Sequence, residues 1–121
     1  MQLNEDFGVA SAKLEELKAR IVRLKIDLSS IEESFSRGGG KGGQKVNKTS
    51  NRVQLSYPSL EIRVACQRER KRSLNRFFAL RELVDQIEMK ISPETSERLA
   101  EIRRIQKRKA GKRARAAEKL A

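Results

Sequence analysis

The residues with the clearest chemical potential lie in one short stretch, "SRGGGKGGQKVNKTSNRVQL", which runs from Ser36 to Leu55. It places five glycines in six positions and follows them directly with Gln44. No carboxylate or thiol lies beside this amide, and the whole chain contains no His. His-dependent dyads with Ser or Cys are therefore excluded, as are imidazole metal sites. The stretch offers backbone groups, a neutral amide and cations for any chemistry that it performs.

Two other interpretations of the glycines can be weighed on the residues alone. Residues 42–49 nearly match the motif of a nucleotide-binding phosphate loop, but Asn47 occupies the position of the second glycine of that motif. The chain is also short for a nucleotide-binding sheet. A plain connection between two strands needs only two residues, and glycine costs backbone entropy, so a connection explains the composition poorly. Glycines accumulate where backbone must approach a ligand closely.

The distribution of charge indicates a polyanionic partner. The 121 residues carry 28 Lys and Arg against 16 Asp and Glu, a net charge of +12. Residues 34–60 hold basic side chains and no acidic one, and residues 93–121 are also strongly basic. Cations clustered at this density are typical of nucleic-acid binding.

Cysteine content and hydropathy limit the cellular compartments in which the protein is expected. Cys66 is alone, so the chain has no disulfide framework and no thiolate metal cluster. The N-terminus has no basic-then-apolar signal, and no apolar run approaches membrane-spanning length. We expect a cytoplasmic protein that binds no membrane.

The elements that must position the glycine stretch follow from periodicity. Apolar residues in steps of three and four predict an amphipathic helix over 10–26 and a longer one over 71–91. Alternating residues predict strands near 31–36, 51–57 and 60–66, the last two joined as a hairpin. The expected fold class is α+β, a small mixed or antiparallel sheet packed by the two helices.

The C-terminal region lacks the long apolar repeats of the preceding elements. "SPETSE" is a strong helix start, with Ser92 as N-cap and Pro93 at the first helical position. Beyond Gln106 nothing apolar except Ala recurs, so this basic tail is expected to be helical or disordered. We divide the chain into a domain over 1–92 and a tail over 93–121.

The stretch as a whole resembles a known family. "DLSSIEESFSRGGGKGGQKVNKTSNRVQL", together with "IRVACQRER" and Asn75-Arg76, is similar to the glycine-glycine-glutamine domain of class I peptide chain release factors and their ribosome-rescue relatives. The similarity covers about residues 24–90. Lys41 and the Arg70-Lys71-Arg72 run depart from the family's usual residues. No stop-codon-reading superdomain fits in 121 residues, so the resemblance points to the codon-independent branch.

That resemblance implies a ribosome-dependent peptidyl-tRNA hydrolase. The implied catalytic residues are Gly42, Gly43 and Gln44, with the Gln44 backbone N–H as donor to the developing oxyanion in the peptidyl-transferase centre. No metal and no cofactor is implied. A glutamine methyltransferase acting on Gln44 is a further partner raised by the resemblance. The rival hypothesis is a noncatalytic ribosome- or rRNA-binding module that retains the fold.

Two sets of cations are expected to hold the chain on the ribosome, as a monomer. Contacts with large-subunit rRNA are predicted for Arg37, Lys41, Lys45, Lys48, Arg70 and Arg76. The tail is expected to recognise the stalled complex in place of a codon-reading domain. It would do so either in the vacant mRNA channel of the small subunit or on split large subunits that carry peptidyl-tRNA. Its predicted contacts are Arg103, Arg104, Lys107, Arg108, Lys109, Lys112, Arg113 and Arg115.

Overall fold

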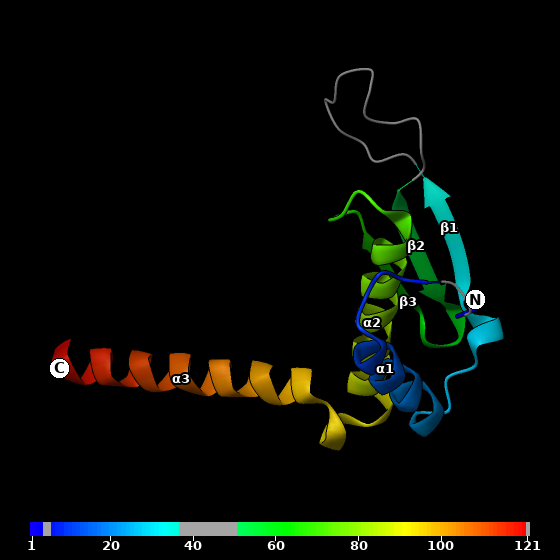
Figure 1. Cartoon of the computed structure of the whole chain (residues 1–121). Coiled ribbons are helices and arrows are strands. Elements are labelled where there is room, and N and C mark those ends of the chain that lie inside the picture. The colour runs from blue at the N-terminus through cyan, green and yellow to red at the C-terminus, as the bar shows by residue number, and fades with distance from the viewer. Residues whose placement is uncertain (4–5, 37–50, 121) are drawn as a thin grey trace.

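A three-stranded antiparallel sheet and two helices on one of its faces form the body of the protein (Figure 1). The structure is a computed structural model that describes residues 1–3, 6–36 and 51–120. The strands follow one another in the order β1-β2-β3, with β1 over Glu32–Ser36, β2 over Arg52–Tyr57 and β3 over Ile62–Cys66. This confirms the predicted α+β class and makes the sheet antiparallel throughout.

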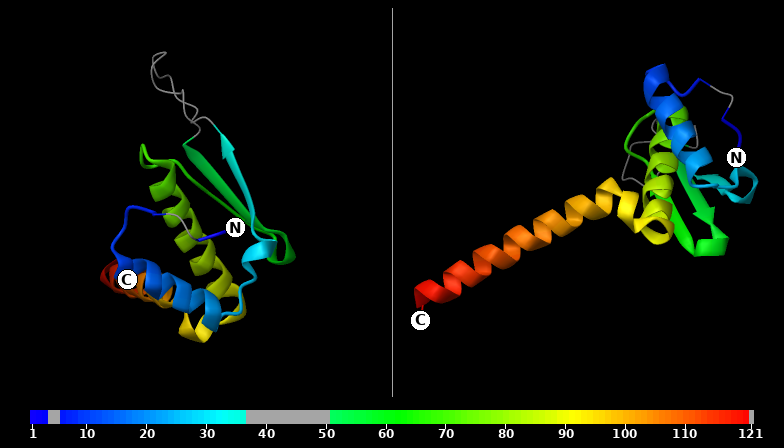
Figure 2. Two further views of the ribbon diagram at one scale, coloured as in Figure 1. Left: turned by 45° about the vertical axis from the view of Figure 1, so that its right-hand side comes forward. Right: turned by 90° about the horizontal axis from the view of Figure 1, so that it is seen from below.

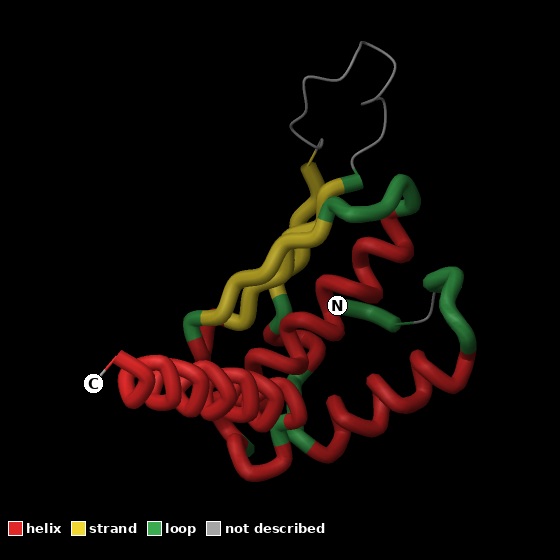
Figure 3. Tube along the Cα trace, turned by 90° about the vertical axis from the view of Figure 1, so that its left-hand side faces the viewer, coloured by secondary structure: helices red, strands yellow, loops and turns green. Residues whose placement is uncertain are grey.

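Helix α2 packs on one face of the sheet with α1 beside it, and within the described residues no helix lies on the opposite face (Figure 3). Helix α1 spans Ser11–Arg23 and α2 spans Arg72–Ile91, both close to the predicted ranges. The alternation in β2 sends Val53 and Leu55 into the core, where at most 1% of either residue is exposed. Polar residues alternate with them on the opposite face, as one wet face requires.

The core lies between this sheet face and α2. Leu80, Leu83 and Val84 on α2 are fully buried against the strands. Phe7, ahead of α1, is also buried, and its ring lies 6.4 Å from that of Phe77. The N-terminal segment thus closes the core, which periodicity in the sequence did not predict.

Helix α3 (Glu97–Leu120) projects from the body instead of packing on it (Figures 1 and 2). None of its residues is buried. The tail is therefore helical, one of the two predicted states, and its Ala, Lys, Arg and Glu content favours that state. None of the helices within the described residues is long and apolar enough to cross a membrane.

The start of α3 differs from the predicted one. Pro93–Thr95 forms a separate 3-10 turn, and the α-helix begins four residues after Pro93, at Glu97. Ser96, not Ser92, accepts a hydrogen bond from a backbone N–H of the first helical turn, that of Leu99 at 3.1 Å. The Ser92 hydroxyl contacts the Thr95 hydroxyl at 2.7 Å instead, because the turn folds back on itself.

Candidate functional site

The glycine stretch emerges from one end of the sheet. Ser36, the last residue of β1, pairs with Arg52, the first residue of β2, so the chain leaves and re-enters the sheet at neighbouring positions (Figure 1). The intervening residues 37–50 lie outside the described part of the chain. They include seven predicted site residues, namely Arg37, Lys41, Gly42, Gly43, Gln44, Lys45 and Lys48.

Asn75 on α2 fixes the backbone where the stretch returns to the sheet. Its amide nitrogen donates to the carbonyl oxygens of Asn51, at 2.6 Å, and Glu69, at 2.9 Å. Its amide oxygen accepts from the Glu69 N–H at 3.0 Å, and the Cys66 thiol lies 3.5 Å from the same oxygen. With an exposed fraction of 0%, Asn75 joins the exit of the glycine stretch to α2 and to the segment after β3.

The sequence contains a signal for this role of Asn75. Asn is a weak helix former, because its amide competes with the backbone for hydrogen bonds. Asn75 nevertheless lies within the first turns of α2. A polar residue at such a position indicates a side chain engaged with backbone groups, although the sequence cannot say which groups.

Arg76 has a different environment from the one predicted. Its Nε atom donates to Glu33 at 2.8 Å, and its guanidinium also donates to the carbonyl oxygen of Gln2 at 3.0 Å. Only 8% of the residue is exposed, and the guanidinium lies 5.4 Å from the ring centroid of Phe7. Glu33 on β1 neutralises the Arg76 guanidinium in this structure, and the rRNA contact predicted for Arg76 stays a prediction.

Exposed cations lie near the stem of the glycine stretch, which consists of the described residues that flank it, Ser36, Asn51 and Arg52. Arg70 and Lys71 are exposed immediately before α2. Arg72, at the start of α2, places its guanidinium 4.7 Å from the ring centroid of Phe35 on β1. The surface beside the stem is therefore basic, and the RNA contact predicted for Arg70 stays a prediction that its exposure allows.

At the other end of α2, the Glu88 carboxylate accepts hydrogen bonds from three side chains. Arg20 and Arg23 on α1 contact its two carboxylate oxygens at 2.7 and 2.9 Å, and the Thr95 hydroxyl donates at 2.7 Å. Burial raises the pKa of the Glu88 carboxyl, but hydrogen bonds from Thr95, Arg20 and Arg23 outweigh it and lower the pKa to about 2. Glu88 is thus charged at neutral pH although it is buried.

The same cluster extends to α3. Arg98, in the first turn of α3, contacts Glu82 at 2.6 Å and Asp85 at 3.0 Å, both on α2. Asp85 also accepts from Arg20 at 2.8 Å. The Arg98 guanidinium holds the pKa of the Glu82 carboxyl below its usual range. Charged contacts therefore join α1, α2 and the root of α3.

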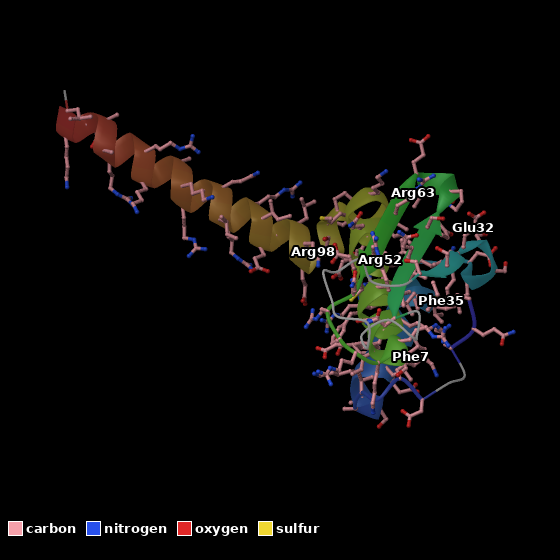
Figure 4. All side chains as sticks on the ribbon, turned by 90° about the horizontal axis from the view of Figure 1, so that it is seen from above. Phe7, Glu32, Phe35, Arg52, Arg63 and Arg98 are labelled. Carbon is pink, nitrogen blue, oxygen red and sulfur yellow. The ribbon has the colours of Figure 1, made fainter. Side chains whose placement is uncertain are left out.

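The predicted tail cations all lie on the surface of α3. Their side chains radiate from the helix along its length (Figure 4). Each of the eight is exposed: Arg103, Arg104, Lys107, Arg108, Lys109, Lys112, Arg113 and Arg115. Because they surround the helix, it offers positive charge in several directions.

Comparison with known proteins gives a consistent result. A family model described as the RF-1 domain matches residues 19–120. "Mitochondrial translation release factor in rescue" of Mus musculus is 35% identical over 97 residues, which cover 80% of this chain and 53% of that protein. Its Homo sapiens counterpart is 36% identical over 86 residues, covering 71% and 52% respectively.

A longer relative matches a smaller part of the chain. "Peptide chain release factor 1" of Leuconostoc citreum is 42% identical over 59 residues, covering 49% of this chain and 16% of that protein. The chain spans little more than half the length of the rescue relatives it matches.

Proposed function

The chain belongs to the RF-1 domain family, and from that premise we propose that it hydrolyses peptidyl-tRNA on the ribosome without reading a codon. The observation that carries the proposal is a Gly42-Gly43-Gln44 sequence between two paired strands of an RF-1 domain. The relatives named for rescue support the codon-independent form.

In the proposed mechanism the protein contributes geometry, because the tRNA ester is already activated. The Gln44 backbone N–H donates to the oxyanion that develops on the ester carbon, and the Gln44 side chain restricts which nucleophile enters. Gly42 and Gly43 leave room for a turn that a Cβ would obstruct. No titrating side chain is needed, which fits a chain without His.

Such a mechanism requires that the stretch be aimed from a fixed base. The pairing of Ser36 with Arg52 and the buried hydrogen bonds of Asn75 supply one. Small errors in placement reduce catalysis steeply, because the donor must meet the oxyanion within hydrogen-bonding distance. The rigidity of the stem therefore supports a catalytic role over simple binding.

Recognition of the stalled complex is assigned to the basic tail over 93–121, beside a catalytic domain over 1–92. Two substrates remain open, a whole stalled ribosome with a vacant mRNA channel and a split large subunit that carries peptidyl-tRNA. Methylation of Gln44 and the cytoplasmic localisation expected from the sequence stay predictions.

The test is peptide release from two purified substrates, ribosomes stalled with an empty decoding site and large subunits carrying peptidyl-tRNA. Gly43→Val should abolish release while ribosome binding persists, because the added side chain alters backbone geometry and not charge. Gln44→Pro should be inactive, since it lacks the N–H, and Gln44→Ala should keep partial activity.

Gly111→Val is the matched control, because Gly111 lies on α3, where an added Cβ would meet only the end of the Arg115 side chain, at 3.6 Å. It should release peptide as the unaltered chain does. Full ribosome binding without release from either substrate would instead identify a noncatalytic rRNA-binding module.

A further inference from the structure

An open groove of about 470 Å³ runs between β3 and α2 and reaches the start of α3. Strand β3 forms its outer wall, and within the described residues the far edge of β3 pairs with no other strand. Figure 4 labels Arg63 on this strand and Arg98 at the root of α3. The side chains that give the groove its character are Arg63, Arg68, Phe78, Arg81, Glu82 and Arg98.

One aromatic ring organises two of these arginines. The guanidinium carbon of Arg68 lies 4.0 Å from the centroid of the Phe78 ring, and that of Arg81 lies 5.2 Å from it. Both distances are within the range of cation–π attraction. The ring restricts both guanidiniums while leaving their N–H donors available, so a ligand would meet a partly ordered site.

The described side chains that line the groove carry more positive than negative charge. Its one carboxylate, Glu82, accepts from Arg98 at 2.6 Å. In contrast, no carboxylate of the described residues lies within 4.0 Å of Arg63, Arg68 or Arg81. Four arginines line the described groove against one carboxylate, and this excess of positive charge favours an anionic ligand.

We propose that this groove binds an unpaired RNA strand, with phosphates on the guanidinium forks and a base stacked on the platform that the Arg68 guanidinium forms over the Phe78 ring. The choice of RNA rests on the proposed function, whereas the binding itself requires no hydrolysis. Arg68 lies next to Glu69, which Asn75 binds at the stem, and Arg98 lies in the first turn of α3. A strand in the groove therefore connects the stem of the glycine stretch with the basic helix.

The experiment measures binding of the full chain to a fluorescein-labelled 12-nucleotide oligouridylate by fluorescence anisotropy over a salt series. Arg68→Gln with Arg81→Gln should weaken binding about tenfold at low salt and make the salt slope shallower by about 1.4, since each lost phosphate contact on a single strand contributes roughly 0.7. The control, Lys13→Gln with Lys18→Gln on α1, removes the same charge away from the groove and should change the affinity less than twofold.

A second variant separates the contribution of guanidinium stacking to RNA affinity from the contribution of charge. Arg68→Lys with Arg81→Lys keeps both charges but removes the planar guanidiniums, and about threefold weaker binding is expected. Equal affinity of the glutamine and control variants, unchanged affinity of the lysine variant, or a polyglutamate peptide binding as tightly as the RNA would each overturn the proposal.

Release assays on the same variants keep this proposal separate from the proposed function. A chain that binds oligouridylate through the groove but releases no peptide contradicts the hydrolase alone. A chain that releases peptide while its glutamine variant binds the oligonucleotide normally contradicts the groove alone.

Discussion

The two ends of α2 are held by opposite kinds of polar chemistry. At the stem, the neutral amide of Asn75 bonds to backbone groups and is fully buried. At the junction with α3, Glu88 and its neighbours form charged pairs whose arginines are partly exposed. Figure 2 shows that α3 extends away from the sheet and the other helices.

This difference teaches which properties each end can have. Hydrogen bonds between neutral groups change little with pH or salt, so the contacts of Asn75 with Asn51 and Glu69 keep their geometry across conditions. Charged contacts at partly exposed sites weaken with salt and with protonation. The Asn75 contacts are therefore insensitive to pH and salt, whereas the anchoring of α3 responds to them.

The largest effect is expected from Asn75→Ala. The substitution leaves two backbone carbonyls and one N–H without their buried partner, which should reduce the free energy of unfolding by about 4 kcal/mol. Urea unfolding measures this loss, and peptide release by the folded fraction should fall roughly a hundredfold because the stretch loses its fixed base.

Gln67→Ala provides the control, since Gln67 is an exposed amide that follows β3. It should leave both quantities nearly unchanged. An Asn75→Ala protein that loses less than about 1 kcal/mol would show that the stem is held in some other way.

A smaller, pH-dependent effect is expected from Glu88→Gln. The folded-state pKa of about 2 lies below the ordinary value of 4.5, so ionised Glu88 stabilises the protein above pH 4.5. That stabilisation is lost as the pH falls from 4.5 toward 2. The variant should therefore lose roughly 2 kcal/mol at pH 7 and show a flatter dependence of unfolding free energy on pH across this window.

The measurement is urea unfolding at several pH values between 7 and about 2. Glu101→Gln, which removes an exposed carboxylate from α3, is the control and should follow the unaltered protein. Parallel curves for Glu88→Gln and the unaltered protein below pH 4.5 would contradict the assignment.

The smallest effect on stability is expected from deleting residues 107–121. No residue of α3 is buried, so the free energy of unfolding should change by less than about 0.5 kcal/mol. Ribosome affinity should nevertheless fall, and its salt slope should become shallower, because seven cations are lost: Lys107, Arg108, Lys109, Lys112, Arg113, Arg115 and Lys119.

Thermal unfolding and ribosome sedimentation over a salt series check the two halves of this prediction. If the truncated chain binds ribosomes as tightly as the full chain, the tail is a solvated surface. A large loss of stability would instead show that α3 belongs to the cooperative unit.

Elements with a repeating pattern were predictable from the sequence. β2 was expected at 51–57 and lies at Arg52–Tyr57, because alternation fixes which face is buried. α2 was expected at 71–91 and spans Arg72–Ile91, because its apolar stripe repeats over several turns. A repeating apolar pattern therefore predicts both the type of an element and the face that it buries.

Residues that act singly were not predictable. Phe7 is one aromatic in a polar segment and forms no pattern, yet it completes the core. The pairing of Arg76 with Glu33 joins residues 43 positions apart, which only the folded chain brings together. Asn75 and Glu88 are polar residues whose burial depends on partners that the folded chain supplies, so no structural role was assigned to either from the sequence.

The edge of β3 that pairs with no other strand of the described residues has a consequence for solubility. A free strand edge offers backbone donors and acceptors to another chain, and proteins discourage such strand addition by placing charged side chains along the edge. Arg63 and Arg68 have that effect here, since two copies meeting edge to edge would bring their guanidiniums together. The arginines proposed to bind RNA would thus also disfavour the edge-to-edge approach of a second copy, and their neutralisation would remove that effect.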